Sequence, residues 1–203
     1  MTDYEFPAEL LAAQEVRDAD LERLGASLRL AAAAEGLVDV AYRVVDSPVG
    51  PLLLAGTGLG LVRVAFAREG HEAVLEQLSK AVSPRILAAP ARLDLAAREM
   101  DEYFSGRRHS FDLDLDFRLA SGFRREVLAH LPEIGYGHTA SYAAVAAMTS
   151  SPRAVRAVGT ACARNPLPLV VPCHRVIRSD GSQGAYLGGT EAKSVLLALE
   201  AGQ

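Results

Sequence analysis

A cysteine followed at once by a histidine and an arginine is the most chemically informative feature of this sequence. Cys173, His174 and Arg175 come directly after the apolar run 169–172. A thiol is a strong nucleophile only as the thiolate, and a neighbouring imidazole and guanidinium favour that anion. We therefore expect the chemistry of the protein to occur at Cys173. The second cysteine, Cys162, falls on an apolar helix face and is interpreted as a core residue.

Two short helices are predicted ahead of this cysteine. Residues 141–148 predict a helix with Ser141 as its N-cap. After a polar turn, a second helix is predicted to begin with Ser151 as N-cap and Pro152 at the first position, and to end near Ala163. The pair is typical of a helix-turn-helix, although small Ala-rich helix pairs are also common in protein cores.

The second helix of the pair has one apolar side and one side of small or basic residues. The apolar residues are Ala154, Val155, Val158 and Cys162, and those of the other side are Arg153, Arg156, Thr160 and Ala163. Small residues let a helix approach a DNA groove closely, and an arginine among them can reach between bases or pair with a phosphate. A surface salt bridge is the alternative interpretation for Arg156.

The charge of the chain is divided unevenly. The net charge is −4, but residues 1–117 hold 20 acidic and 12 basic side chains, whereas residues 118–203 hold 5 acidic and 9 basic ones. This asymmetry indicates either a C-terminal half that faces a polyanion or a solvated basic face on an ordinary enzyme. No apolar run is long enough to span a membrane, and two cysteines are too few for a disulfide framework. We expect a cytoplasmic protein with no membrane or metal site.

The order of predicted elements indicates an α+β N-terminal part followed by a helical C-terminal part. Helices are predicted at 5–35, 70–81, 91–105 and 122–131, an antiparallel meander at 38–66, and a half-exposed strand at 111–117. Within the last segment, Asp112, Asp114 and Asp116 form a stripe. Such a stripe could bind a metal, but on the outer face of an edge strand it more commonly prevents aggregation.

Several motifs together give the chain a family resemblance. They are Arg156-Ala157-Val158-Gly159, Arg164-Asn165-Pro166, Val171-Pro172-Cys173-His174-Arg175-Val176, Ser179-Asp180-Gly181, Tyr186-Leu187-Gly188-Gly189, Lys193 and Glu200. The chain resembles the methylated-DNA–protein-cysteine methyltransferases, also called O6-alkylguanine-DNA alkyltransferases. The resemblance is dense over residues 120–203, and over 38–117 it extends to layout only.

The resemblance implies a role for each matching residue. Cys173 would accept the alkyl group, His174 would act as a base through a water, and Glu200 would orient the histidine. Asn165 would brace the active-site turn, and Tyr186 would donate its hydroxyl to N3 of guanine. Arg156 would take the place of the extruded nucleotide, and Tyr142 would press on the adjacent phosphate. The carbonyls of Cys173 and Val176 would receive the exocyclic amine of the base, and Lys193 would lie at the pocket edge. Arg153 and Thr160 would face the DNA from the outer side of the helix.

The resemblance also implies the fold, the partner and the reaction. It predicts a small ribonuclease-H-like domain at 38–118 and an all-helical DNA-binding and alkyl-acceptor domain at 119–203, with a helix-turn-helix and an active-site loop. Residues 1–37 would form a helical extension of unknown role. The expected partner is double-stranded DNA containing O6-alkylguanine, approached from the minor groove by a monomer. The lesion, or O4-alkylthymine, would be flipped out and its alkyl group transferred irreversibly, in a single turnover and without a cofactor.

Some positions depart from the family pattern, and other functions remain open. Residues 1–117 lack cysteine, so the zinc site of some relatives is not expected. Ala185 and Leu187 replace smaller or polar residues and leave the range of accepted alkyl groups open. A non-catalytic lesion binder is the main alternative, but it would lack the nucleophile. A transcription factor would not need the Cys-His pair. A thiol hydrolase would not need the helix that carries the arginines.

Overall fold

The computed structural model describes residues 17–202 of the chain. Helix α1 (Asp18–Ala34) belongs to a unit of its own that ends at Leu37, and residues 38–203 form the second unit. Within α1, Leu21, Leu24 and Leu28 are exposed. The helix lies inside the predicted helical segment 5–35, of which residues 5–16 lie outside the described part. No helix among the described residues is long and apolar enough to cross a membrane.

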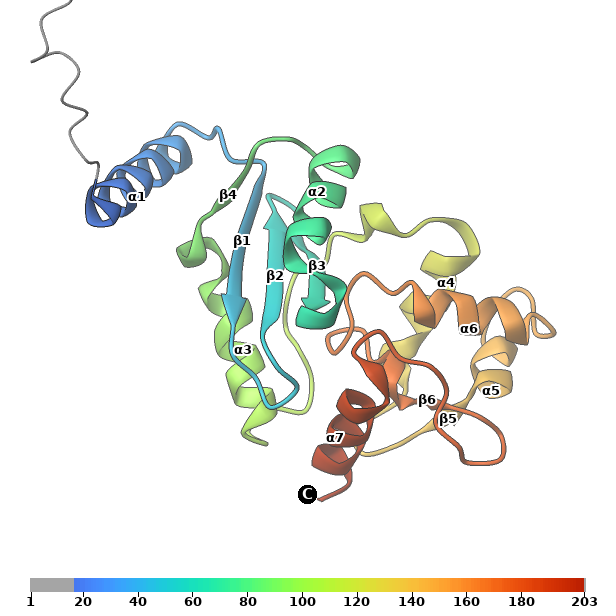
Figure 1. Ribbon diagram of the computed structural model, residues 1–203. Helices are drawn as coiled ribbons and strands as arrows, with labels where there is room; N and C mark the ends of the chain where they lie inside the picture. Colours follow the sequence, from blue (N-terminus) through green and yellow to red (C-terminus); the bar gives the residue numbers. More distant parts are fainter. Residues whose placement is uncertain (1–16, 203) are drawn as a thin grey trace, which may run out of the picture. The chain divides into compact units, whose positions relative to one another are not determined.

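The first half of the second unit is a four-stranded sheet with helices packed on it (Figure 1). Strands β1 (Val40–Val45), β2 (Leu52–Thr57) and β3 (Gly60–Phe66) form the predicted antiparallel meander, with Ala41 opposite Gly56 and Leu53 opposite Ala65. Short β4 (Ile86–Ala88) pairs in parallel with β1 and completes the order β3-β2-β1-β4. It was not predicted, because three residues are too few to show strand periodicity.

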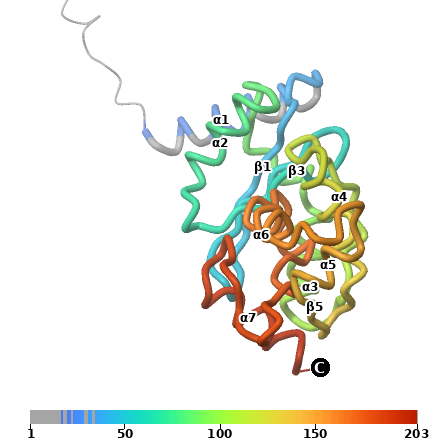
Figure 2. Tube along the Cα trace, turned by 90° about the vertical axis from the view of Figure 1, so that its right-hand side faces the viewer, coloured from blue at the N-terminus to red at the C-terminus, as the bar shows by residue number. Residues whose placement is uncertain are grey.

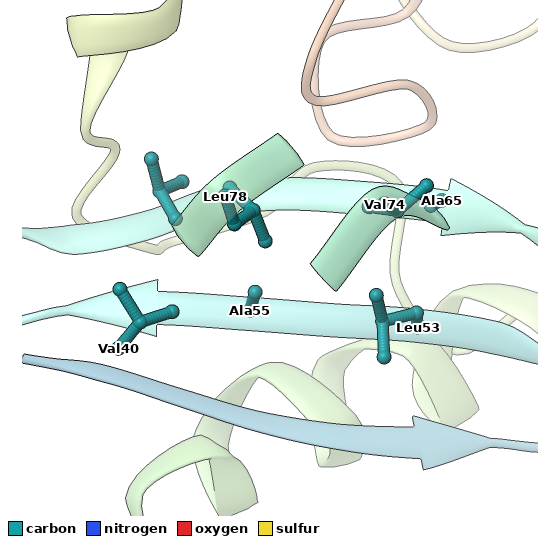
Figure 3. Close-up of a cluster of buried hydrophobic side chains, with 7 residues drawn as sticks. Val40, Leu53, Ala55, Ala65, Val74 and Leu78 are labelled. Carbon is teal, nitrogen blue, oxygen red and sulfur yellow. The ribbon is translucent and has the colours of Figure 1, made fainter. Parts of the chain in front are cut away.

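The two faces of this sheet pack against different helices. On one face, Val40, Leu53 and Ala55 form a buried cluster with Val74 and Leu78 of α2 (His71–Ala81), as Figure 3 shows. Neighbouring residues of a strand point to opposite faces. Accordingly, Ala41 lines a cavity on the other side together with Leu93 and with Ala96 of α3 (Asp94–Phe104). Both helices were predicted, at 70–81 and 91–105.

The alternating segment 111–117 is not a regular strand, contrary to the prediction. Only Leu115 forms a bridge, with Leu61 at the outer edge of β3. Asp116 is buried, not on an outer face: it accepts hydrogen bonds from Thr57 Oγ1 at 2.7 Å and from the Arg118 amide at 3.1 Å. These bonds hold a 3-10 turn, so this acid has a structural role that strict alternation concealed.

The C-terminal half is mainly helical. It contains α4 (Gly122–His130), α5 (Tyr142–Ala147), α6 (Val155–Ala163) and α7 (Gly189–Ala201). A two-residue parallel pair, β5 (Ala140–Ser141) with β6 (Val176–Ile177), joins distant parts of the chain. Figure 2 shows α5 and α6 beside each other in the helix-turn-helix arrangement, and α4 also contacts α6. The α+β prediction is confirmed.

The start of α6 differs from the prediction. Ser141 caps α5 as expected, because its Oγ accepts from the Ala144 amide at 3.0 Å. Ser151 does not cap α6: residues 151–154 form a turn, and Ala154 is the N-cap without a side-chain bond. One consequence is that Val155, predicted on the apolar side, is 37% exposed. The Ser-Pro signal marked the turn and not the helix.

Candidate active site

Asn165 braces the turn between α6 and the reactive cysteine. The asparagine is completely buried, and its Nδ2 donates to the carbonyl of Val171 at 2.8 Å and to Cys173 Sγ at 3.1 Å. Its Oδ1 accepts from the amide of Leu167 at 2.9 Å. Within the turn, Leu169 has a φ of 70°, a strained conformation for a branched side chain, which persists only where the surroundings enforce it. The bracing therefore fixes both the turn and the thiol.

The same turn is fastened to the sheet. The Val64 amide of β3 donates to the carbonyl of Pro166 at 2.9 Å, and Arg63 Nη1 reaches that carbonyl at 3.3 Å. Arg63 is itself paired with Glu69. Because these bonds cross from the first half of the unit to the second, the position of the active-site turn depends on the N-terminal sheet.

Cys173 is held as a thiol in the resting protein. It begins a 3-10 turn over Cys173–Arg175 and is 2% exposed. Burial raises the pKa of Cys173 to about 11, although the hydrogen bond from Asn165 and the charge of Lys193 act in the opposite direction. We expected the neighbouring imidazole and guanidinium to favour the thiolate; burial is the largest influence on the pKa of Cys173 and favours the neutral thiol in the resting protein.

The guanidinium of Arg175 is directed to a carboxylate and not to the thiol. Its Nε donates to Glu200 Oε2 and its Nη2 to Glu200 Oε1, both at 2.9 Å, while Nη1 donates to the carbonyl of Ile134 at 2.6 Å. Such a two-pronged contact is the preferred arginine–carboxylate geometry. Arg175 therefore fixes Glu200, a role that the motifs did not indicate.

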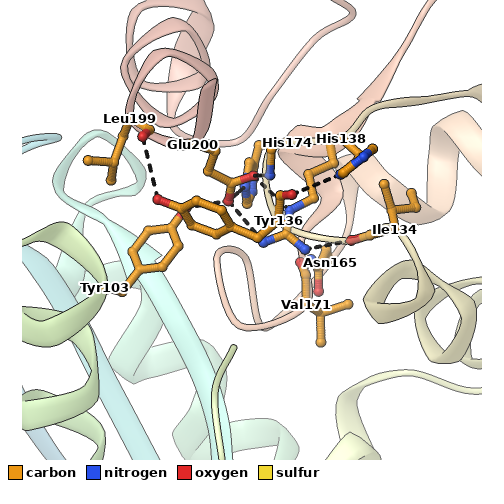
Figure 4. Close-up of polar contacts among 11 residues, drawn as sticks. Tyr103, Ile134, Tyr136, His138, Asn165, Val171, His174, Leu199 and Glu200 are labelled. Atoms are coloured by element: carbon orange, nitrogen blue, oxygen red, sulfur yellow. Dashed lines mark hydrogen bonds and ion pairs between the residues drawn. The ribbon is translucent and has the colours of Figure 1, made fainter. Parts of the chain in front are cut away.

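Glu200, near the end of α7, is the centre of the buried hydrogen-bond network in Figure 4. Besides Arg175, it accepts from His174 Nε2 at 2.9 Å, from the Tyr103 hydroxyl at 2.7 Å and from the Gly137 amide at 3.3 Å. Burial raises the pKa of Glu200, but the hydrogen bonds from His174 and Arg175 outweigh it and lower the pKa to about 2. Glu200 is thus a carboxylate that only accepts hydrogen bonds.

This carboxylate determines the tautomer of His174. Because Glu200 only accepts, Nε2 of the histidine must carry the hydrogen, and Nδ1 keeps its lone pair. Nδ1 is buried, and no described residue forms a hydrogen bond with it. Burial is the main cause that lowers the pKa of His174, with Glu200 opposing it. His174 is therefore a neutral base whose accepting nitrogen is Nδ1.

Tyr186 presents an unused donor on the active-site loop. Its hydroxyl oxygen is buried, and no described residue forms a hydrogen bond with it. Burial raises the pKa of Tyr186 well above its usual value, so the group remains protonated. The ring meets Phe66 edge-on at 5.5 Å and His174 edge-on at 6.3 Å. A fixed ring with an unpaired hydroxyl is suited to a ligand with a hydrogen-bond acceptor.

Glycines let this loop approach the aromatic rings on both sides. A Cβ on Gly184 would overlap the Tyr142 hydroxyl, and one on Gly188 would lie 2.7 Å from the Phe66 ring. Tyr142 is half-buried, and burial raises its pKa, with Cys162 and Cys173 adding to the effect. Tyr142 therefore lies against the active-site loop.

Lys193 lies deeper than predicted. We expected it at the pocket edge, but it is fully buried and its Nζ donates to the Val176 carbonyl at 2.6 Å. Burial lowers the pKa of Lys193, and Cys173 opposes the shift. A carbonyl oxygen has two lone pairs, so Val176 keeps one for a ligand. The lysine thus supports the floor of the site.

The predicted DNA-facing residues of α6 lie apart from this buried network. Arg153, Arg156 and Thr160 are all exposed, but Arg153 was predicted on the helix face and lies instead in the turn before α6. Thr160 Oγ1 donates back to the Arg156 carbonyl at 3.1 Å. The guanidinium of Arg156 forms no ion pair or hydrogen bond with a described residue, which disfavours its interpretation as a salt-bridge residue. Cys162 is buried, as predicted.

Two residues of the site were missed by sequence reasoning. Tyr103 lies 97 residues before Glu200, and Phe66 belongs to the sheet. Neither stands near a motif, so only the fold brings them to the site. Among the described residues, no group of three or more His, Cys, Asp or Glu side chains could hold a metal ion.

Comparison with known families covers both halves of the second unit. Residues 40–117 match the ribonuclease-like domain of the family described as 6-O-methylguanine DNA methyltransferase, and residues 122–202 match its DNA binding domain. The ribonuclease-like fold of the N-terminal domain is therefore shown, together with the helical domain that follows it.

Individual relatives agree with this match. A methylated-DNA–protein-cysteine methyltransferase of Methanosarcina barkeri is 39% identical over 159 residues, which is 78% of this chain and 96% of that protein. The crystal structure of a Mycobacterium tuberculosis O6-methylguanine methyltransferase superposes with a TM-score of 0.71 at 37% identity, covering 80% of this chain and 93% of that one. A structure of the M. tuberculosis protein OGT in complex with DNA gives 0.69 at 38% identity over the same shares. The chain belongs to the methylated-DNA–protein-cysteine methyltransferase family.

Proposed function

We propose that this protein repairs O6-alkylguanine in duplex DNA, and O4-alkylthymine as well, by moving the alkyl group onto Cys173. It would thus act as a methylated-DNA–[protein]-cysteine S-methyltransferase. The observation that carries the proposal is the buried arrangement in which Asn165 bonds the thiol of Cys173 while Glu200 bonds the adjacent His174. The names of the relatives and the DNA complex of one of them support the same reaction.

The proton of the thiol moves to the histidine in this mechanism. Adjacent side chains rarely face each other, so Cys173 loses its proton through a water to Nδ1 of His174. The imidazolium that forms is stabilised by Glu200, whose carboxylate accepts from Nε2 at 2.9 Å. Asn165 donates to the sulfur and stabilises the negative charge that develops there.

The departing base needs stabilisation at the same moment. The sulfur attacks the alkyl carbon in line, the bond from that carbon to O6 breaks, and its electron pair passes into the guanine ring. We assign the Tyr186 hydroxyl, which has no partner among the described residues, as the donor to N3, which takes up part of this charge. The guanine anion then takes up one proton at N1, and His174 releases the thiol proton to water, so both groups end neutral. The carbonyls of Cys173 and Val176 accept from the exocyclic amine, and Lys193 holds Val176 in position.

The product explains why one turnover is expected. A thioether is a very poor leaving group, and the chain contains no sequence fingerprint for a cofactor that could regenerate the thiol. Each chain would therefore accept one alkyl group. We also propose that the protein acts as a monomer.

DNA contact is assigned to the helix-turn-helix. Beside Arg156, the exposed residues of α6 are Val155, Thr160 and Ala163, none of them longer than valine, which suits a close approach to the minor groove. Arg156, whose guanidinium has no partner among the described residues, takes the place of the flipped nucleotide. Tyr142 presses on the neighbouring phosphate, and Arg153 and Thr160 contact the backbone. Accordingly, we assign residues 119–203 to DNA binding and alkyl transfer, residues 38–118 to a supporting domain, and residues 1–37 to an extension.

The direct test is repair of a duplex that contains O6-methylguanine. Chromatography of the released nucleosides should show the lesion replaced by guanine, in an amount equal to the protein added. Cys173→Ser should leave the lesion unchanged, whereas Cys162→Ala should repair it normally. Tight binding by the wild-type protein without repair would instead support a non-catalytic alkyltransferase-like lesion binder.

Transfer to Cys173 should be nearly independent of pH from roughly pH 7 to 9. His174 is neutral in this range because its pKa lies below 6.5, and it takes the proton of a thiol whose pKa is about 11. In His174→Ala only the ionised thiol can react, so the rate should rise with pH towards 11. Stopped-flow measurements with free O6-benzylguanine test this; an equally steep rise in the wild-type protein would contradict the role of His174.

Arg156→Ala should slow repair in duplex DNA far more than transfer from a free base. Flipping the nucleotide costs a few kcal/mol, and Arg156 is the side chain available to fill the gap in the duplex. We expect a loss of about tenfold or more with duplex DNA and little change with free O6-benzylguanine. Arg178→Ala, also in the basic half but outside α6, is the matched control. Equal slowing on both substrates would contradict the role of Arg156 in flipping.

A further inference from the structure

One oxygen of Glu200 receives three side-chain donors, and one of them comes from the N-terminal half of the unit. Oε1 accepts from the Tyr103 hydroxyl at 2.7 Å, from His174 Nε2 at 2.9 Å and from Arg175 Nη2 at 2.9 Å. Tyr103 belongs to α3, and the bond spans 97 residues of sequence. The bond from Tyr103 is the shortest of the three. Since all three donors bond Oε1, Tyr103 and His174 share one carboxylate oxygen.

The ring of Tyr103 is fixed by its neighbours. It is 1% exposed and packs against Phe104 and Phe111, each with ring centroids 5.3 Å away, and edge-on against Tyr136 at 6.1 Å. Burial, together with the charge of Glu200, raises the pKa of Tyr103, so the hydroxyl stays protonated and donates. A donor on a ring with no room to turn holds its acceptor in one place (Figure 4).

We propose that Tyr103 is a positioning residue of the transfer reaction: its hydroxyl holds the Glu200 carboxylate in the orientation that sets the tautomer and basicity of His174. This inference rests on the function proposed above and assigns a task in the chemistry to the ribonuclease-like domain. Tyr103 touches neither the thiol nor the lesion, so it acts only through Glu200.

The hydroxyl also limits how strongly Glu200 acts on the histidine. A carboxylate oxygen that accepts several hydrogen bonds has less charge available for each. Without the Tyr103 hydroxyl, Glu200 would interact more strongly with the imidazolium, and the pKa of His174 would rise. The other ionisable or charged groups that face the pair are Arg175, Lys193, Cys173, Tyr136 and Tyr186. None of them changes when only the Tyr103 hydroxyl is removed.

A second tyrosine of the same cluster provides a matched control. The Tyr136 hydroxyl donates to the Leu199 carbonyl at 3.4 Å and makes no hydrogen bond with Glu200. Tyr103→Phe and Tyr136→Phe each remove one hydroxyl from this aromatic cluster and keep the ring. A purely structural contribution would therefore affect both variants in similar ways, whereas positioning through Glu200 would affect only the first.

The experiment measures the rate of benzyl transfer from free O6-benzylguanine against pH, with intact-mass detection of the product. We expect the acid limb of the Tyr103→Phe profile to move up by roughly half to one pH unit, because neutral His174 is then available only at higher pH. Transfer below the limb should slow by about threefold to tenfold, as that shift implies. Tyr136→Phe should keep the wild-type limb.

Replacement of Tyr103 by 3-fluorotyrosine tests the same idea without removing the hydroxyl. The fluorinated phenol is more acidic and donates more strongly, so the limb should move to lower pH. An unchanged limb in both Tyr103 variants, or an equal shift in Tyr136→Phe, would overturn the role of Tyr103 while transfer by the wild-type protein still upheld the proposed function. No transfer by the wild-type protein would overturn both.

Discussion

Glu200→Gln should slow alkyl transfer by about a hundredfold or more, the usual contribution of an oriented acid–base group. The carboxylate accepts from Tyr103, His174, Arg175 and the Gly137 amide. A glutamine has one acceptor oxygen and one donor group, so at least one of these donors would face another N–H. The tautomer of His174 would no longer be fixed, and Arg175 would be left as a buried charge without its counter-ion.

The same variant should lose stability. Breaking a buried ion pair by removing one partner typically costs roughly 3–5 kcal/mol, which we expect as the drop in the free energy of unfolding. Because folding lowers the pKa of Glu200 from 4.5 to about 2, its contribution is complete above pH 4.5 and is lost as the pH falls through 2. The stability difference between wild type and variant should therefore shrink in acid.

Glu191→Gln is the matched control for this prediction. Glu191 lies in the first turn of the same helix, α7, and is exposed. Urea unfolding and benzyl transfer measured side by side should show both losses in Glu200→Gln and neither in Glu191→Gln. A Glu200→Gln variant that transfers at the wild-type rate would mean that His174 does not need this carboxylate.

Asn165→Ala should impair both the stability of the active-site turn and the reactivity of the thiol. The asparagine, the only one in the chain, satisfies the Val171 carbonyl and the Leu167 amide and donates to Cys173 Sγ. In the variant the Leu167 amide loses its partner, whereas the Val171 carbonyl still accepts from the Cys173 amide at 2.8 Å. A buried group left without a partner costs roughly 1–3 kcal/mol, and we expect the free energy of unfolding to fall by about that amount. Without the donor to sulfur, the pKa of Cys173 should rise further.

The expected rate loss for folded Asn165→Ala is about tenfold or more with free O6-benzylguanine, since a hydrogen bond to a charged sulfur contributes roughly 1.5–3 kcal/mol. Thr149→Ala provides the comparison. Thr149 is buried in the turn between α5 and α6, where its hydroxyl donates to Ala146 and accepts from Ser151. The Thr149→Ala variant should be less stable than the wild-type protein, but its rate of benzyl transfer should be unchanged. Equal rate losses in both variants would show that Asn165 acts only through general stability.

The residues near Cys173 were the most predictable part of the molecule. The thiol, its histidine, Asn165, Tyr186 and the distant Glu200 were all named from motifs, and the structure brings them together. Motifs preserve short spacings that a reacting group requires. The pKa of the thiol could not be predicted from its basic neighbours, because it depends mainly on burial, which follows from how the whole unit packs.

Contacts between distant segments could not be read from the sequence. Tyr103 and Phe66 reach the site from the N-terminal half, and nothing in their neighbourhood distinguishes them from ordinary core aromatics. Two short segments were missed or wrongly predicted for a related reason. Strand β4 has too few residues to show a strand period, and Asp116 is buried, where it accepts a hydrogen bond from Thr57. Local patterns predict local structure, whereas these features follow from tertiary packing.

Intact-protein mass spectrometry after incubation with a large excess of O6-methylguanine duplex tests whether Cys173 is the alkyl acceptor and is used once. Each chain should gain the mass of one methylene group and no more, and peptide mapping should find it on Cys173. The gain should be absent in Cys173→Ser. Modification of Cys162 instead, or unmodified protein alongside continued loss of the lesion, would contradict the assignment of Cys173 as an acceptor used once.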